Sequence, residues 1–217
     1  MRKLVFTQKG VGLVEAVVAI GILITGIISV VSLSQSNIAS SQGVVARLTA
    51  INLAREGVEA VRSMRDGNWL KGRTNVTGED NAWDSGFNGA GDVTAIAVLN
   101  ADSLAWTLDF APASMTDNGT RLRRNQDRGL YRQSRENPIP AGEIASLYSR
   151  LLTIYSICRN RPGQQETYDN LTCSSGWDKV GIRVISRVEW QERGQAVGLE
   201  VEDWLYNWRY SFTPYVP

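Results

Sequence analysis

Residues 11–33 read VGLVEAVVAIGILITGIISVVSL, and this stretch decides the class of fold. As a helix it would be about 35 Å long, enough to cross a hydrocarbon core of ~30 Å. The preceding residues 1–10, MRKLVFTQKG, carry three basic residues and no acidic one, which predicts a cytoplasmic N-terminus. A secretory signal peptide usually has an apolar region of only about 7–15 residues. The sequence therefore predicts one membrane-spanning helix.

Glu15 is the only charged residue in this apolar stretch, and the next one along the chain is Arg47. A carboxylate inside a membrane span costs free energy unless it is paired or reaches water. One explanation is that Glu15 lies near the interface, where the positive end of the helix dipole tolerates an anion. The other is that it has a functional partner.

Residues 9–15, KGVGLVE, together with the basic leader and the apolar helix, resemble the processing site of type IV prepilins. The resemblance implies that a prepilin peptidase cuts between Gly10 and Val11 and methylates the new N-terminus at Val11. It also implies that Glu15, the fifth mature residue, pairs with the Val11 amino group of a neighbouring subunit. The chain departs from the family in two places, with Val11 where phenylalanine is usual and Ser32 where many pilins have proline.

The same resemblance implies a location and a set of partners. The precursor is expected in the cytoplasmic membrane and the mature subunit, a major or minor pilin, in a cell-surface pilus. Its expected partners are copies of itself and other pilins, the prepilin peptidase, the membrane and the assembly platform. No cofactor, metal or enzymatic activity is expected. Two alternatives stay open: a pseudopilin of a type II secretion system, and a membrane-anchored ligand- or DNA-binding domain that does not polymerise.

The helix is expected to continue beyond the apolar segment, which we bound at 11–34, as an amphipathic helix over 35–66. Apolar residues recur there at steps of three and four: Val44, Leu48, Ile51, Ala54, Val58 and Val61. Another face carries charges spaced for ion pairs, including Arg62 with Glu59 and Arg62 with Asp66. The sequence Asp66-Gly67-Asn68 predicts the end of the helix.

Residues 67–217 are predicted to form a β-rich extracytoplasmic domain. It begins with a loop over 71–92, rich in Gly, Asn and Asp. Alternating apolar residues predict strands over 147–158 and 180–190, and a hairpin that turns at Arg193-Gly194 into 197–202. Shorter strands are expected over 105–110 and 129–133. A long helix followed by an antiparallel meander is an α+β fold.

The amino-acid composition narrows the chemistry. The chain has no histidine, so it has no Ser/His/Asp or Cys/His relay and no imidazole metal ligand. Its two cysteines, Cys158 and Cys173, lie fifteen positions apart and do not form a Cys-x-x-Cys pair. A disulfide in an exported domain is the favoured interpretation, and two separate buried thiols are the alternative.

The run RLRRNQDRGLYRQSR at 121–135 contains six arginines and one aspartate. The arginines are Arg121, Arg123, Arg124, Arg128, Arg132 and Arg135. Clustered guanidinium groups could contact nucleic-acid phosphates. A solvated loop or a subunit contact is favoured instead, because 23 basic residues against 22 acidic ones leave the chain nearly neutral.

Overall fold

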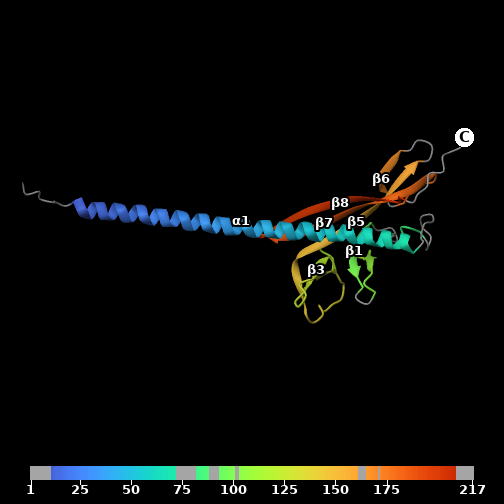
Figure 1. Cartoon of the computed structure of the whole chain (residues 1–217), viewed down its shortest axis with the longest axis horizontal. Coiled ribbons are helices and arrows are strands. Elements are labelled where there is room, and N and C mark those ends of the chain that lie inside the picture. The colour runs from blue at the N-terminus through green and yellow to red at the C-terminus, as the bar shows by residue number, and fades with distance from the viewer. Residues whose placement is uncertain are drawn as a thin grey trace, which may run out of the picture. The chain divides into compact units, whose positions relative to one another are not determined.

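The computed structural model describes residues 11–71, 82–87, 93–100, 103–160, 165–170 and 172–208. In these residues one helix, α1 (Val11–Leu70), precedes eight strands, and every strand pairing is antiparallel. The fold is α+β, as the sequence predicts (Figure 1). The chain divides into two compact units, residues 1–47 and 48–217.

Residues 11–47 belong to the first unit and are helical throughout. Among the described residues, α1 is the one helix long and apolar enough to cross a membrane, with a mean hydropathy of 2.6 over its most apolar window. None of that window is buried. The helix thus fits a single-pass membrane anchor, because only lipid or other protein chains could cover such a surface.

In the second unit, the helix packs on the sheet through a stripe of mostly small residues. The buried positions on this stripe are Ala50, Leu53, Ala54, Gly57, Val58, Ala60 and Val61. The apolar pattern of the predicted amphipathic helix includes Val44 and Leu48, but these two residues do not pack on the sheet and are 55% and 56% exposed. At Gly57, an added Cβ would lie 2.7 Å from Ser186 Oγ. The absence of a side chain at Gly57 therefore lets the helix backbone approach the sheet.

The helix also continues beyond the predicted end at Asp66, and it terminates at Leu70. Its last turn is held by Asn68, whose buried side-chain amide donates hydrogen bonds to the carbonyl oxygens of Trp83 and Ser85, each at 2.9 Å. Trp69, next to it, is only 3% exposed. Contacts with the 82–87 segment thus override the local stop signal.

The strands bring distant parts of the chain together around β5. Their bounds are β1 Thr94–Leu99, β2 Trp106–Asp109, β3 Arg121–Asn125, β4 Tyr131–Arg132, β5 Glu143–Asn160, β6 Glu166–Asn170, β7 Trp177–Glu192 and β8 Gln195–Tyr206. Strand β7 pairs with β5 from Ser149 to Asn160, while β3, β1 and β6 pair with successive parts of β5. Because a strand has two edges, β3, β1 and β6 follow one another along the edge opposite β7.

The predicted hairpin is confirmed as β7 and β8, which pair in continuous register from Glu192↔Gln195 to Gly181↔Tyr206. Arg193 and Gly194 form its two-residue loop with φ angles of 53° and 79°. Positive φ at both positions is the geometry that joins twisted strands tightly. As predicted, Ile182, Val184 and Val188 of β7 are buried.

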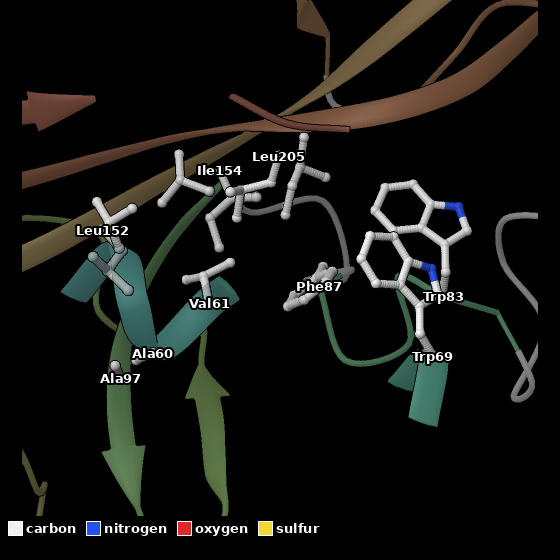
Figure 2. Packing of buried hydrophobic residues seen from close by; sticks show 12 residues of the cluster. Ala60, Val61, Trp69, Trp83, Phe87, Ala97, Leu152, Ile154 and Leu205 are labelled. Atoms are coloured by element: carbon white, nitrogen blue, oxygen red, sulfur yellow. The ribbon is translucent and has the colours of Figure 1, made fainter. Parts of the chain in front are cut away.

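The core lies between residues 48–70 of α1 and one face of this sheet. Figure 2 shows Val61 of the helix facing Leu152, Ile154 and Leu205 of the strands. Trp69, Trp83 and Phe87 continue the same cluster at the end of the helix. The core therefore joins the helix, the 82–87 segment and three long strands into one folding unit.

Candidate functional site

The apolar part of α1 carries the residues that the sequence singles out for assembly. Glu15 lies on its first turns and is exposed, and Val11 begins the helix. Gly10 and the side chain of Val11 lie outside the described residues. Large apolar side chains such as Leu13, Ile22 and Val30 are exposed by 76%, 66% and 68%. The helix thus presents a carboxylate within a continuous apolar surface.

The hydroxyl groups of Thr25 and Ser29 are satisfied by the helix itself. Thr25 donates its hydroxyl to the carbonyl oxygens of Gly21 and Ile22 at 3.0 and 2.9 Å. The Ser29 hydroxyl donates to the carbonyl oxygen of Thr25 at 2.7 Å. Such internal bonds let small polar residues face an apolar environment without a desolvation penalty.

A shallow apolar groove of about 330 Å³ runs along this helix beside Gly26. Its other lining residues are aliphatic, and they are Ile22, Leu23, Ile27, Val30 and Val31. Glycine at this position removes a side chain from the helix surface, which allows a neighbouring helix to approach closely. The groove has the shape and chemistry for apolar side chains.

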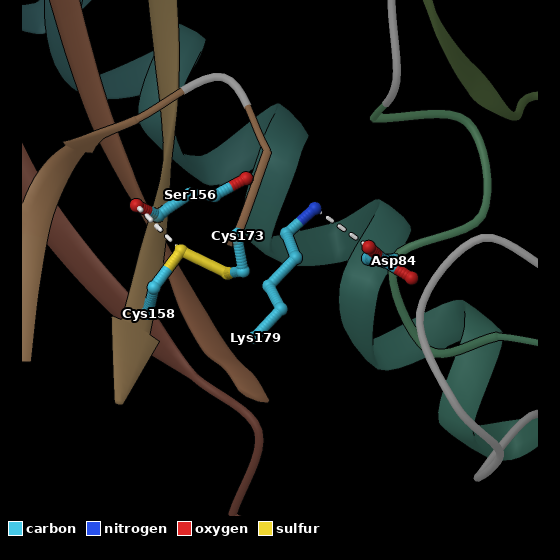
Figure 3. Close-up of a disulfide and its surroundings, with 5 residues drawn as sticks. All are labelled: Asp84, Ser156, Cys158, Cys173 and Lys179. Atoms are coloured by element: carbon cyan, nitrogen blue, oxygen red, sulfur yellow. Dashed lines mark hydrogen bonds and ion pairs between the residues drawn. A yellow bond between two sulfur atoms is a disulfide. The ribbon is translucent and has the colours of Figure 1, made fainter. Parts of the chain in front are cut away.

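The disulfide between Cys158 and Cys173 is confirmed, with a Cα–Cα distance of 5.5 Å. It joins β5 to the segment that follows β6. Figure 3 shows it beside the buried ion pair of Lys179 and Asp84, whose Nζ and Oδ2 atoms are 2.6 Å apart. Both side chains of that pair are at most 4% exposed. A covalent and an ionic link therefore fix the same end of the sheet.

Replacing both Cys158 and Cys173 with serine should lower the free energy of unfolding by about 3 kcal/mol, because the bridge closes a loop of fifteen residues. Urea titration of the full chain in detergent would measure the loss. Peptide mapping without reductant should show one linked pair in the wild type. Free thiols that react with an alkylating agent in freshly isolated protein would contradict the bridge.

The arginine run is only in part the loop that the sequence favours, since residues 126–130 and 133–135 lie outside the strands. Residues 121–125 form β3, which pairs with β5, and residues 131–132 form β4. Leu122 lies in the core with no exposure, while Arg121 and Arg124 are exposed. The pattern does not alternate strictly, because the register against β5 shifts between Arg121 and Arg123. Backbone pairing with β5 therefore outweighs the local excess of charge.

Four of the six arginines are engaged within the chain, and Arg121 is one of them, since its Nε donates to the Ser146 carbonyl oxygen at 2.9 Å. Arg132 makes ion pairs with Glu143 and, at 3.5 Å, with Glu136. Arg135 lies 3.5 Å from Asp109. Arg123 is 5% exposed and donates from Nη2 to the carbonyl oxygen of Glu136.

The other two arginines are Arg124 and Arg128, both exposed. Within the described part of the chain they form no ion pair. The run thus has fewer arginines that are exposed and without a partner in the chain than its sequence suggests.

Sequence analysis missed a buried polar cluster centred on Arg150, which has no exposed surface. Its Nη1 donates to the carbonyl oxygen of Leu53 at 2.8 Å, and its Nε donates to Gln133 Oε1 at 3.0 Å. The carboxylate of Glu56 lies 3.7 Å away. A single arginine inside the apolar pattern LYSRLLTIYSIC at 147–158 was the available signal.

Burial governs the protonation of this cluster. Burial lowers the pKa of Arg150 below its usual value, and the nearby Glu56 carboxylate opposes this decrease only in part. Burial also raises the pKa of Glu56, against the opposing influence of Arg150. These contacts tie the helix to β5 through charge and a hydrogen bond.

Among the residues that the structure describes, no three His, Cys, Asp or Glu side chains lie close enough together to hold a metal ion. No protein-family model, no curated protein and no solved structure matches this chain.

Proposed function

We propose that this chain is a structural, non-catalytic subunit of a type IV pilus-like surface filament. The leader 1–10 is removed between Gly10 and Val11, and the chains then polymerise through the first part of α1. Glu15 pairs with the Val11 amino group of a neighbouring subunit. The β-rich unit would then be carried outside the membrane, which is consistent with its disulfide.

The observation that carries this proposal is the length of uncharged helix. From Ala16 to Ala46 the chain has 31 residues without a charge, and all are helical. This segment is about 46 Å long, whereas a simple anchor needs only ~30 Å of helix. The uncharged helix is therefore longer than a membrane span requires, as expected for a helix that other helices cover along its whole length.

Exposed apolar side chains beyond the membrane-spanning stretch support the same proposal. Ile38, Val44 and Val45 are 57%, 55% and 60% exposed, although they follow the stretch needed to span a membrane. A helix that faces water normally carries charged residues on its outer face. Serine, alanine and glycine fill much of 34–43 instead, which favours close packing of helices.

Mechanical shearing of the source cells should release the mature chain in filaments, with an N-terminal sequence that begins at Val11. Intact mass would show the loss of residues 1–10 and one added methyl group. Replacing Gly10 with phenylalanine should leave unprocessed precursor in the membrane, because a bulky side chain would hinder the peptidase, whereas Gly10→Ala is the matched control.

Each result of this experiment separates the candidates. A mature chain that begins at Met1 would exclude the prepilin assignment. A chain that is processed at Val11 but absent from sheared filaments would indicate the pseudopilin alternative. An unprocessed chain that stays in the membrane would indicate an anchored domain that does not polymerise.

A further inference from the structure

A small cavity beside β3 contains more positive charge than its surroundings neutralise. Its volume is about 190 Å³, and it lies between β3 and the segment that follows β4. The polar residues that line it are Asn118, Arg121, Arg123, Glu136 and Asn137. At ~30 Å³ per molecule the cavity has room for about six waters, so one phosphate or a carboxylate on a short stem fits.

Arg123 lines this cavity and has a buried donor without an acceptor. The residue is 95% buried, given its 5% exposure, and its Nη2 donates to the Glu136 carbonyl oxygen. Its Nη1 is also buried but has no hydrogen-bond partner among the described residues. A guanidinium cannot neutralise itself by losing a proton, so an unpaired buried donor stays costly until an acceptor is supplied.

Arg121 brings a second guanidinium to the same cavity. Its Nε donates to the Ser146 carbonyl oxygen at 2.9 Å, and no described residue pairs with its terminal nitrogens. The one acidic lining residue, Glu136, directs its carboxylate at Arg132, at 3.5 Å. Two arginines therefore line the cavity, against one carboxylate that is already shared.

We propose that this cavity binds a small oxyanion, a carboxylate or a phosphate, held by Arg123 and Arg121. The planar guanidinium fork matches both groups through paired, charge-assisted hydrogen bonds. A water could accept one bond from Arg123 Nη1, but it would not offset the charge of two arginines. The site is separate from the apolar helix, so it does not depend on filament assembly.

Equilibrium dialysis of the full chain in detergent against radiolabelled inorganic phosphate would test the proposal. One saturable site per chain is expected. Arg121→Gln should weaken binding by at least about tenfold, because it removes one charged donor without touching a buried residue. The matched control is Arg124→Gln, on the same strand and exposed but not lining the cavity, and it should change the affinity less than about twofold.

Competition with N-acetyl-aspartyl amide distinguishes the sources of the anion. If this single carboxylate displaces phosphate, the site accepts an acidic side chain of a polypeptide. If it does not, the site is specific for a phosphoryl group. The absence of saturable binding of either anion would overturn the proposal. It would also be overturned if Arg124→Gln weakened the binding of phosphate or of a DNA duplex as much as Arg121→Gln, since this would indicate a diffuse basic surface.

Discussion

Replacing Arg150 with alanine should lower the free energy of unfolding of the globular unit by about 3–5 kcal/mol, since the change breaks a fully buried ionic cluster. The Leu53 carbonyl oxygen and Gln133 Oε1 would each lose their donor from Arg150. Glu56, 3.7 Å from the guanidinium, would lose the positive charge that offsets its burial. The variant would also leave a cavity between helix and sheet.

The matched control for this prediction is Arg187→Ala, which removes the same side chain from an exposed position. Arg187 is 52% exposed and pairs with Glu189 at 2.6 Å and Glu200 at 3.3 Å. Exposed pairs contribute up to about 1 kcal/mol, so this variant should be nearly neutral. Urea unfolding of the full chain in detergent, followed by tryptophan fluorescence, would measure both. Equal losses in the two variants would show that the buried cluster does not hold the helix to the sheet.

The parts of the fold that the sequence predicted are those where one chemical pattern dominates. The apolar run 11–33 predicts a helix long enough to span a membrane, and alternation over 182–190 of β7 and along β8 indicates that one face is the more buried. The Arg193-Gly194 turn adds a local signal to the same hairpin. Each of these elements is encoded within a short window of sequence, so it could be identified without knowing its partners.

The elements that were missed depend on partners far along the chain. Strand β3 consists of RLRRN, and only its pairing with β5 makes it a strand. Strand β1 is short, and strand β6 is polar and pairs with β5 beside the disulfide. The helix passes its stop signal because the 82–87 segment accepts hydrogen bonds from Asn68. Such tertiary contacts override local propensity.

Side-chain partners were the hardest feature to predict. The sequence spacing suggested that Arg62 pairs with both Glu59 and Asp66. The structure confirms Glu59, but the second partner is Asp203 of β8, and Asp66 pairs with Arg65 at 3.0 Å. Likewise, nothing near Arg150 in the sequence indicates Gln133 or Glu56. A single sequence without the three-dimensional register could not have located these partners.

Glu15→Ala should reduce incorporation of the subunit into filaments by at least about a hundredfold, if the proposed assembly is right. Glu15 is the only charge between Val11 and Ala46, so a bundle of these helices offers it no other partner on this surface. Removing the carboxylate would leave the Val11 amine of the neighbouring subunit buried among apolar side chains without a partner. Breaking a buried pair costs about 3–5 kcal/mol, which corresponds to a factor of about a hundred or more.

The precursor itself should be unaffected by this change, because alanine makes the membrane span more apolar. Quantitative immunoblots should therefore show normal amounts of Glu15→Ala chain in membranes and little in the sheared fraction. Thr25→Ala is the control, since the Thr25 hydroxyl is bonded within its own helix, and this variant should assemble normally. If Glu15→Ala enters filaments as efficiently as Thr25→Ala, then Glu15 is only an interfacial residue and the pairing with Val11 is wrong.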